Sequence, residues 1–226
     1  MKRYVILIAF FTISCQEAKK PFELQKGDLL FQDLDSSPLC DAIEIVTPGY
    51  KNANFSHIGI VIELDNSINT SYKYDNKIRV LEAIPNNVKT TRLDSFLNRS
   101  FDSNNNPKVI VGRLKPKYRH LIENGINFMK SNLGVKYDDE FLINNNMYYC
   151  SELIYDAFKE DQIFKLQPMT FLHPETKDTI QIWKEYYSKL NINIPEKELG
   201  INPGVMSISE KIEIVHIYGN PSGMQR

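Results

Sequence analysis

The stretch SHIGIVIEL, residues 56–64, predicts the clearest β-strand of the chain. Successive side chains of a strand point to opposite faces, and every second residue of this stretch is aliphatic. One face therefore consists of Ile58, Ile60, Ile62 and Leu64. We expect this row to face a hydrophobic core, which turns His57 away from the core and beside open space left by Gly59.

Further strands are expected before and after this one. Strand patterns cover residues 27–31, 78–84, 88–93, 109–114 and 212–217. Most of them follow one another without long helices between them, which favours antiparallel pairing. Apolar residues at helical spacing predict helices over residues 41–46, 118–132 and 179–190, and a helix that begins at Cys150. The expected fold class is α+β, with a central antiparallel sheet or partial barrel packed against helices.

Composition excludes several classes of protein. With 226 residues, 42% of them hydrophobic, the chain can bury the core of a single domain. Its 27 basic and 28 acidic residues nearly cancel, so no concentrated basic face is expected, and no nucleic-acid partner. The three cysteines, Cys15, Cys40 and Cys150, include no C-x-x-C pair and no spacing suited to zinc. We expect no disulfide framework, no metal and no cofactor, and Cys40 is interpreted as a structural thiol.

The N-terminus predicts a targeting segment. A basic start precedes the apolar run YVILIAFF at residues 4–11, which is too short to span a bilayer of about 30 Å as a permanent helix. Ser14 before Cys15 resembles the lipobox of bacterial lipoproteins, in which the cysteine is acylated, although Thr12 stands where an aliphatic residue is usual. The alternative is a plain signal peptide with a coincidental cysteine.

The expected organisation has three parts. Residues 1–14 form a lipoprotein signal peptide, residues 15–25 an anchor and linker, and residues 26–226 one domain with an irregular C-terminal extension. Acyl chains on Cys15 would attach the protein to a membrane of the bacterial cell envelope, at a periplasmic or surface face. The oligomeric state is left open.

Cys150 is the candidate nucleophile. It begins a predicted helix, and Leu153 and Ile154 follow at helical spacing, so the thiol leans toward the buried face. Unpaired N–H groups and the positive end of the helix dipole stabilise a thiolate at this position. Position alone is weak evidence, because most free cysteines are inert small hydrophobic residues.

His57 is the candidate base, although a single strand histidine is more often structural. Such a base needs a third group to fix its tautomer and orientation. Glu63 lies six residues along the same strand, about 20 Å away, and is too distant. Glu82 in the next strand is the better candidate, because a carboxylate among aliphatic residues is costly unless it is paired. The alternative is that Glu82 binds Arg79, Arg92 or the backbone.

Four motifs together resemble a known family. GDLLFQ at residues 27–32, SHIGIV at 56–61, VLEA at 80–83 and YYCSEL at 148–153 occur in the order and spacing of the YiiX-like proteins. These are papain-like enzymes of the NlpC superfamily with circularly permuted topology. The resemblance covers about residues 26–158, and INPG at residues 201–204 resembles the family's C-terminal part. It implies the permuted papain-like fold and explains why the histidine precedes the cysteine.

The resemblance also implies roles. Cys150 would be the nucleophile, His57 the base and Glu82 the residue that orients it. The thiolate would attack an amide or ester carbonyl, backbone N–H groups would hold the oxyanion, and water would release the thioester. Further candidates, for substrate binding, are Tyr149, Gln32 and Asp28. Alternatively, Tyr149 has a structural role as a packing aromatic residue, and Asp28 closes a turn.

Two functions of different classes follow. The first is a cell-envelope cysteine hydrolase, a peptidase, amidase or acyl hydrolase, with peptidoglycan peptides or lipid and N-acyl compounds as substrates. The second is a non-catalytic lipoprotein that binds a lipid or peptide in the same cleft. A long apolar channel beside Cys150 would favour lipids, and a shallow polar groove would favour peptides.

Overall fold

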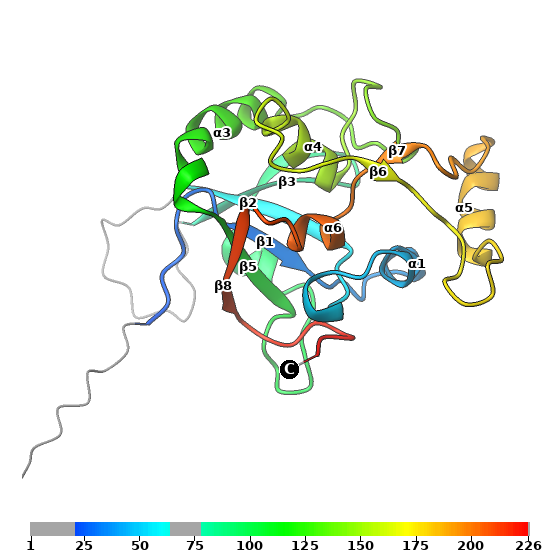
Figure 1. Ribbon diagram of the computed structural model, residues 1–226, viewed down its shortest axis with the longest axis horizontal. Coiled ribbons are helices and arrows are strands. Elements are labelled where there is room, and N and C mark those ends of the chain that lie inside the picture. The colour runs from blue at the N-terminus through cyan, green and yellow to red at the C-terminus, as the bar shows by residue number, and fades with distance from the viewer. Residues whose placement is uncertain (1–20, 64–77, 226) are drawn as a thin grey trace, which may run out of the picture.

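The computed structural model describes residues 21–63 and 78–225, and Figure 1 shows their arrangement. Within these residues, six strands form one antiparallel sheet in the order β4-β3-β2-β1-β5-β8. The strands are β1 Leu29–Gln32, β2 His57–Glu63, β3 Arg79–Ile84, β4 Asn87–Arg92, β5 Val109–Leu114 and β8 Ile212–Ile217. The expected antiparallel sheet is confirmed.

Helices cover the sheet and extend to one side of it (Figure 1). They are α1 Pro38–Val46, α2 Leu93–Leu97, α3 Ile122–Ser131, α4 Cys150–Ala157, α5 Gln181–Leu190 and α6 Pro203–Ser207, with short 3₁₀ helices η1 Tyr50–Asn52 and η2 Pro116–Leu121. A two-stranded ribbon pairs β6 Gln167–Pro168 with β7 Leu199–Gly200. Helix α4 packs on β2 and β3, while α2 contacts β3 and β4. The expected α+β fold is confirmed.

Both faces of the central strands β3, β2, β1 and β5 are largely buried. The isoleucine face of β2 joins the main core, which includes Leu153 and Ile154 of α4. The opposite face joins a second cluster that contains Val80, Phe96 and Leu97. Two hydrophobic layers therefore enclose the centre of the sheet.

The prediction of open space beside His57 is wrong. A Cβ on Gly59 would lie 2.5 Å from a Val80 methyl carbon and 3.0 Å from the Phe96 ring. Glycine at this position therefore allows close packing of the second cluster. His57 itself is 5% exposed.

Several elements differ from their sequence patterns. Helix α1 begins at Pro38, earlier than expected, because proline at the first turn gives up an N–H that has no helical partner. The helix expected over residues 118–132 divides into η2 and α3. The five-residue helices α2 and α6 were not predicted, because they are too short for a periodic pattern.

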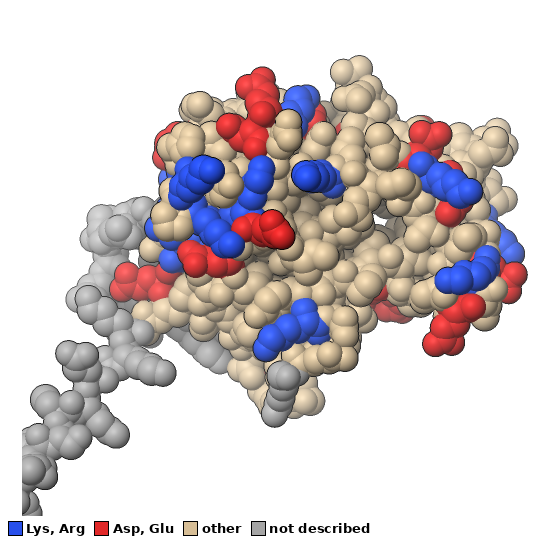
Figure 2. Space-filling view, viewed as in Figure 1, with Lys and Arg blue, Asp and Glu red and all other residues tan. Residues whose placement is uncertain are grey.

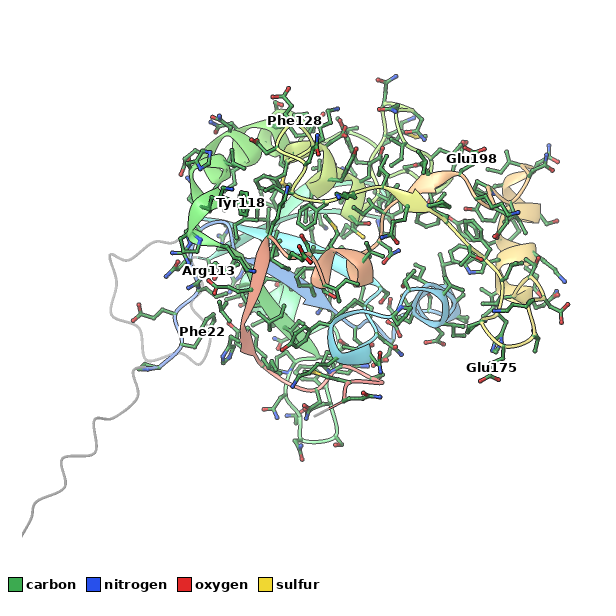
Figure 3. All side chains as sticks on the ribbon, in the orientation of Figure 1. Phe22, Arg113, Tyr118, Phe128, Glu175 and Glu198 are labelled. Carbon is green, nitrogen blue, oxygen red and sulfur yellow. The ribbon has the colours of Figure 1, made fainter. Side chains whose placement is uncertain are left out.

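The start of the described chain packs against the domain. Phe22 stacks on His216 with ring centroids 4.1 Å apart and lies 5.8 Å from the guanidinium carbon of Arg113 (Figure 3). Leu24 also packs against the second cluster. Residues 1–14 and Cys15 lie outside the described residues. Within residues 21–63 and 78–225, no helix has the length and apolar character needed to cross a membrane.

Candidate active site

Cys150 is the first residue of α4 and is 6% exposed. Neighbouring side chains hold the start of this helix to the segment at Ile201. The Ser151 hydroxyl donates to the Ile201 carbonyl oxygen at 3.0 Å, and the Ile201 N–H donates to the Tyr149 hydroxyl at 3.1 Å. The nucleophile candidate therefore lies on a helix start that is fixed from both sides.

The structure brings His57 and Glu82 together across neighbouring strands. His57 Nε2 lies 2.6 Å from Glu82 Oε2, and their side chains are 6% and 0% exposed. A buried carboxylate is costly unless it is paired, and the imidazole supplies a partner. The contact also fixes the orientation of the imidazole ring. Because Nε2 faces Glu82, only the other ring nitrogen remains available to another group.

Cys150 also interacts with His57. Burial alone would lower the pKa of His57, but hydrogen bonds to Cys150 and Glu82, together with their negative charges, raise it from 6.5 to about 9. At neutral pH the imidazole is therefore protonated. An imidazolium between a cysteine and a carboxylate is the arrangement that stabilises a thiolate.

Arg99 is a functional candidate that sequence reasoning missed. Its Nη1 donates to Glu82 Oε2 at 2.7 Å, and its Nη2 donates to Glu82 Oε1 at 2.6 Å. The Thr91 hydroxyl also donates to Oε1. Burial would raise the pKa of Glu82, but these bonds to Arg99 and the contact with His57 hold it well below its usual range.

No sequence pattern marks Arg99 as a functional residue, because it lies in the turn after a helix that was not predicted. The available signal was physical: a fully buried carboxylate requires several donors, of which a single histidine supplies one.

A cavity of about 390 Å³ opens beside Cys150. Its wall is rich in aromatic and aliphatic side chains: Ile43, Val46, Tyr137, Phe141, Tyr149, Met169, Phe171, Trp183, Ile201 and Val205. Trp183 packs edge-to-face with Phe171 and Phe141, at centroid distances of 4.9 and 5.9 Å. Among the described residues that line the cavity, none is acidic or basic. In the view of Figure 2, charged side chains gather toward the left and the right, and mostly uncharged residues lie between them.

The fold agrees with a family comparison. A family model described as permuted papain-like amidase enzyme, YaeF/YiiX, C92 family, matches residues 23–216. The chain belongs to this permuted amidase family. It is accordingly a papain-like cysteine hydrolase or amidase, as the sequence motifs predicted.

A solved structure shows the same fold. The crystal structure of the metalloprotein YiiX from Escherichia coli O157:H7 is 22% identical in sequence, with a TM-score of 0.67 over 88% of this chain and 99% of that chain. No curated protein matches the chain. Among the described residues of this amidase, no three His, Cys, Asp or Glu side chains are grouped so that they could hold a metal ion.

Tyr149 lies where a substrate contact was expected, whereas Gln32 does not. Tyr149 lines the cavity of the amidase, and its hydroxyl accepts the Ile201 N–H. Gln32 is fully buried, and its Nε2 donates to the Phe96 carbonyl oxygen at 2.8 Å. In the β1–β2 register, Gln32 stands opposite His57. The Gln32 side-chain amide therefore holds α2 through the Phe96 carbonyl oxygen, and Gln32 is not part of the cavity wall.

Asp28 and Cys40 also lie outside the cavity wall. Asp28 closes a turn by accepting the Gln25 N–H at 2.7 Å, and it pairs with Arg113 Nε at 2.6 Å. This is the structural alternative considered from the sequence. Cys40 is 8% exposed, and its sulfur lies 3.4 Å from the hydroxyl oxygen of Ser36.

Tyr137 is a second residue that the sequence did not indicate. It lines the cavity, and its ring packs edge-to-face on Phe141. Burial, followed by the negative charge of Cys150, raises the pKa of Tyr137 well above its usual range. Its hydroxyl therefore stays protonated within electrostatic range of the nucleophile candidate.

Proposed function

We propose that this amidase cleaves an amide or ester bond through Cys150, His57 and Glu82. The observation that carries the proposal is the 2.6 Å contact between His57 and Glu82, with Cys150 interacting with the same imidazole at a helix start. These are the three roles that nucleophilic catalysis by cysteine requires: a nucleophile, a base and an orienting group. The cavity beside Cys150 supplies room for a substrate.

The proposed reaction proceeds in two steps. The Cys150 thiolate attacks the carbonyl carbon, backbone N–H groups at the start of α4 stabilise the oxyanion, and the His57 imidazolium gives its proton to the departing amine or alcohol. A thioester remains on Cys150. Water then attacks the thioester while His57 accepts its proton, and the free acid leaves. Glu82 keeps the imidazole oriented throughout.

The cavity supports a substrate with an apolar acyl group. Each buried methylene contributes about 0.8 kcal/mol to binding, so an uncharged aromatic wall favours a hydrocarbon chain. Polar stem-peptide groups would lose their water in this cavity without gaining charged partners from its wall. We therefore favour N-acyl or lipid-like substrates over peptidoglycan peptides. No observation favours the non-catalytic binding protein.

A series of N-acyl anilides of increasing chain length tests the proposal. The full chain, purified in detergent, should release the amine, and Cys150→Ala should reduce the rate by at least about a thousandfold. Cys40→Ala is the matched control, because Cys40 is the other buried free cysteine among the described residues. Equal activity of the Cys150→Ala and wild-type proteins would overturn the proposed mechanism. Faster cleavage of peptide anilides than of N-acyl anilides would overturn the substrate assignment.

We also propose that the enzyme is a cell-envelope lipoprotein attached through Cys15. The support is sequence alone: the apolar run at residues 4–11 and the small residue before Cys15. The near-zero net charge offers no electrostatic route to an anionic surface. A fatty-acid probe should label the wild-type protein in bacteria and should not label Cys15→Ser. Labelling of that variant would refute the anchor.

A further inference from the structure

Glu82 is shared by two cationic groups. His57 contacts its Oε2 at 2.6 Å, while the Arg99 guanidinium binds both oxygens, at 2.7 and 2.6 Å. The Glu82 side chain is fully buried and that of Arg99 is 24% exposed. A two-point bond between planar groups restricts the rotation of the carboxylate more than a single bond does. The two bonds from Arg99 therefore fix the position of Glu82 Oε2 next to the imidazole.

Arg99 is itself held by the small second cluster. Its guanidinium carbon lies 5.0 Å from the centroid of the Phe96 ring, and the same ring lies 5.6 Å from the His57 ring. The backbone of Phe96 is fixed by Gln32, which donates to its carbonyl oxygen at 2.8 Å. Helix α2 thus places one aromatic ring against both the arginine and the histidine.

Charge balance gives Arg99 a function beyond packing. In the reactive state, Cys150 and Glu82 are negative, and His57 and Arg99 are positive, so the four groups together are neutral. Without Arg99, the same state would carry one uncompensated negative charge. Burial disfavours net charge, so the group would take up a proton, and the thiolate would be lost.

We infer that Arg99 is a positioning residue, which acts through Glu82 to keep the proton on His57 and the negative charge on Cys150. This inference rests on the proposed function. Other titratable groups face the same side chains. Tyr137 and Tyr149 interact electrostatically with Cys150, and the exposed Lys89 stands opposite Glu82 in the β3–β4 register.

Alkylation of Cys150 by iodoacetamide tests the inference without a substrate. The rate would be measured from pH 4 to pH 10 in the full-length Cys40→Ala protein, by mass spectrometry of the Cys150 peptide. Arg99→Met should move the midpoint of the rise to higher pH by about one unit, which makes labelling about tenfold slower below the midpoint. Arg99→Lys should recover at least half of the shift, because it restores the charge without the two-point bond.

Arg119→Met is the matched control, because Arg119 is paired with Glu213 at 3.3 Å, away from the site. It should leave the profile unchanged. A purely structural Arg99 would lower the melting temperature and leave the alkylation midpoint in place, which would overturn the inference. If Arg99→Met does not fold, Arg99→Gln replaces it, and a wild-type midpoint in Arg99→Gln has the same meaning.

His57→Ala separates the inference from the proposed function. If His57→Ala changes the profile and the Arg99 variants do not, the inference fails and the proposed mechanism stands. If neither His57→Ala nor the Arg99 variants change it, the activated nucleophile itself is refuted.

Discussion

Glu82→Gln is the substitution that tests the electrostatics of the site most directly. Glu82 Oε2 lies 2.6 Å from His57 Nε2, and both side chains are almost completely buried. Glutamine keeps the shape of the side chain and one oxygen acceptor, but it removes the negative charge. The substitution therefore isolates the effect of that charge on the imidazole.

The expected magnitude follows from the contact. A hydrogen bond to a charged group contributes about 1.5–3 kcal/mol, and one pKa unit corresponds to about 1.4 kcal/mol. The pKa of His57, about 9 in the native protein, should fall by about one to two units in Glu82→Gln. Because the imidazolium is the proposed proton donor, the alkaline limit of activity should move down by the same amount. Arg99 would also lose its carboxylate partner, so we expect a loss of about 1–3 kcal/mol of stability.

Nuclear magnetic resonance titration of the histidine rings measures the pKa directly, with the His57 signal assigned from His57→Ala. Thr91→Val is the matched control, since it removes one hydrogen bond to Glu82 and keeps the charge. Its effect on the pKa of His57 should be clearly smaller. A His57 pKa near 6.5 in the wild-type protein, or an equal pKa in Glu82→Gln, would refute the electrostatic argument.

Three further outcomes are expected. Gly59→Ala should destabilise the protein by about 1–3 kcal/mol in urea unfolding, because the added carbon would lie 2.5 Å from a Val80 methyl carbon; an unchanged midpoint would contradict the close packing. Burial, followed by Asp138, raises the pKa of Glu152 from 4.5 to about 8, so the folded protein holds a proton that the unfolded chain has lost, and stability should fall as pH rises from about 4.5 to 8. Thermal unfolding of Glu152→Gln should show a weaker fall than the wild type, and an identical pH profile would exclude this contribution. Val46→Phe should shift the preference among N-acyl anilides toward shorter chains at an unchanged iodoacetamide rate, because Val46 lines the cavity; an unchanged chain-length profile would place the acyl group elsewhere.

The six strands of the main sheet were predictable because each carries a local signal in the sequence, whereas the two-residue strands β6 and β7 are too short to carry one. Residues 109–114 of the sequence pattern coincide with β5, and the isoleucine row of β2 faces the main core as expected. Alternation of side chains is a local property, so it can be read without the rest of the chain. What alternation did not show is that the opposite face of β2 is also buried, because α2 lies more than 30 residues further along the chain. Its five residues are too few for helical periodicity.

The sequence by itself indicated the groups for which we propose the reaction: Cys150 at a helix start, His57 at a strand start and Glu82 in the next strand. Each depends on local position, which a short pattern specifies. Only the tertiary structure decided how the buried charges are balanced, because Arg99 comes from a turn and reaches Glu82 across the second cluster. The apolar cavity was likewise invisible in the sequence, since its wall combines α1, α5 and the segments near residues 141, 169 and 201. Electrostatic and packing energies depend on distances in space, which separation along the chain does not specify.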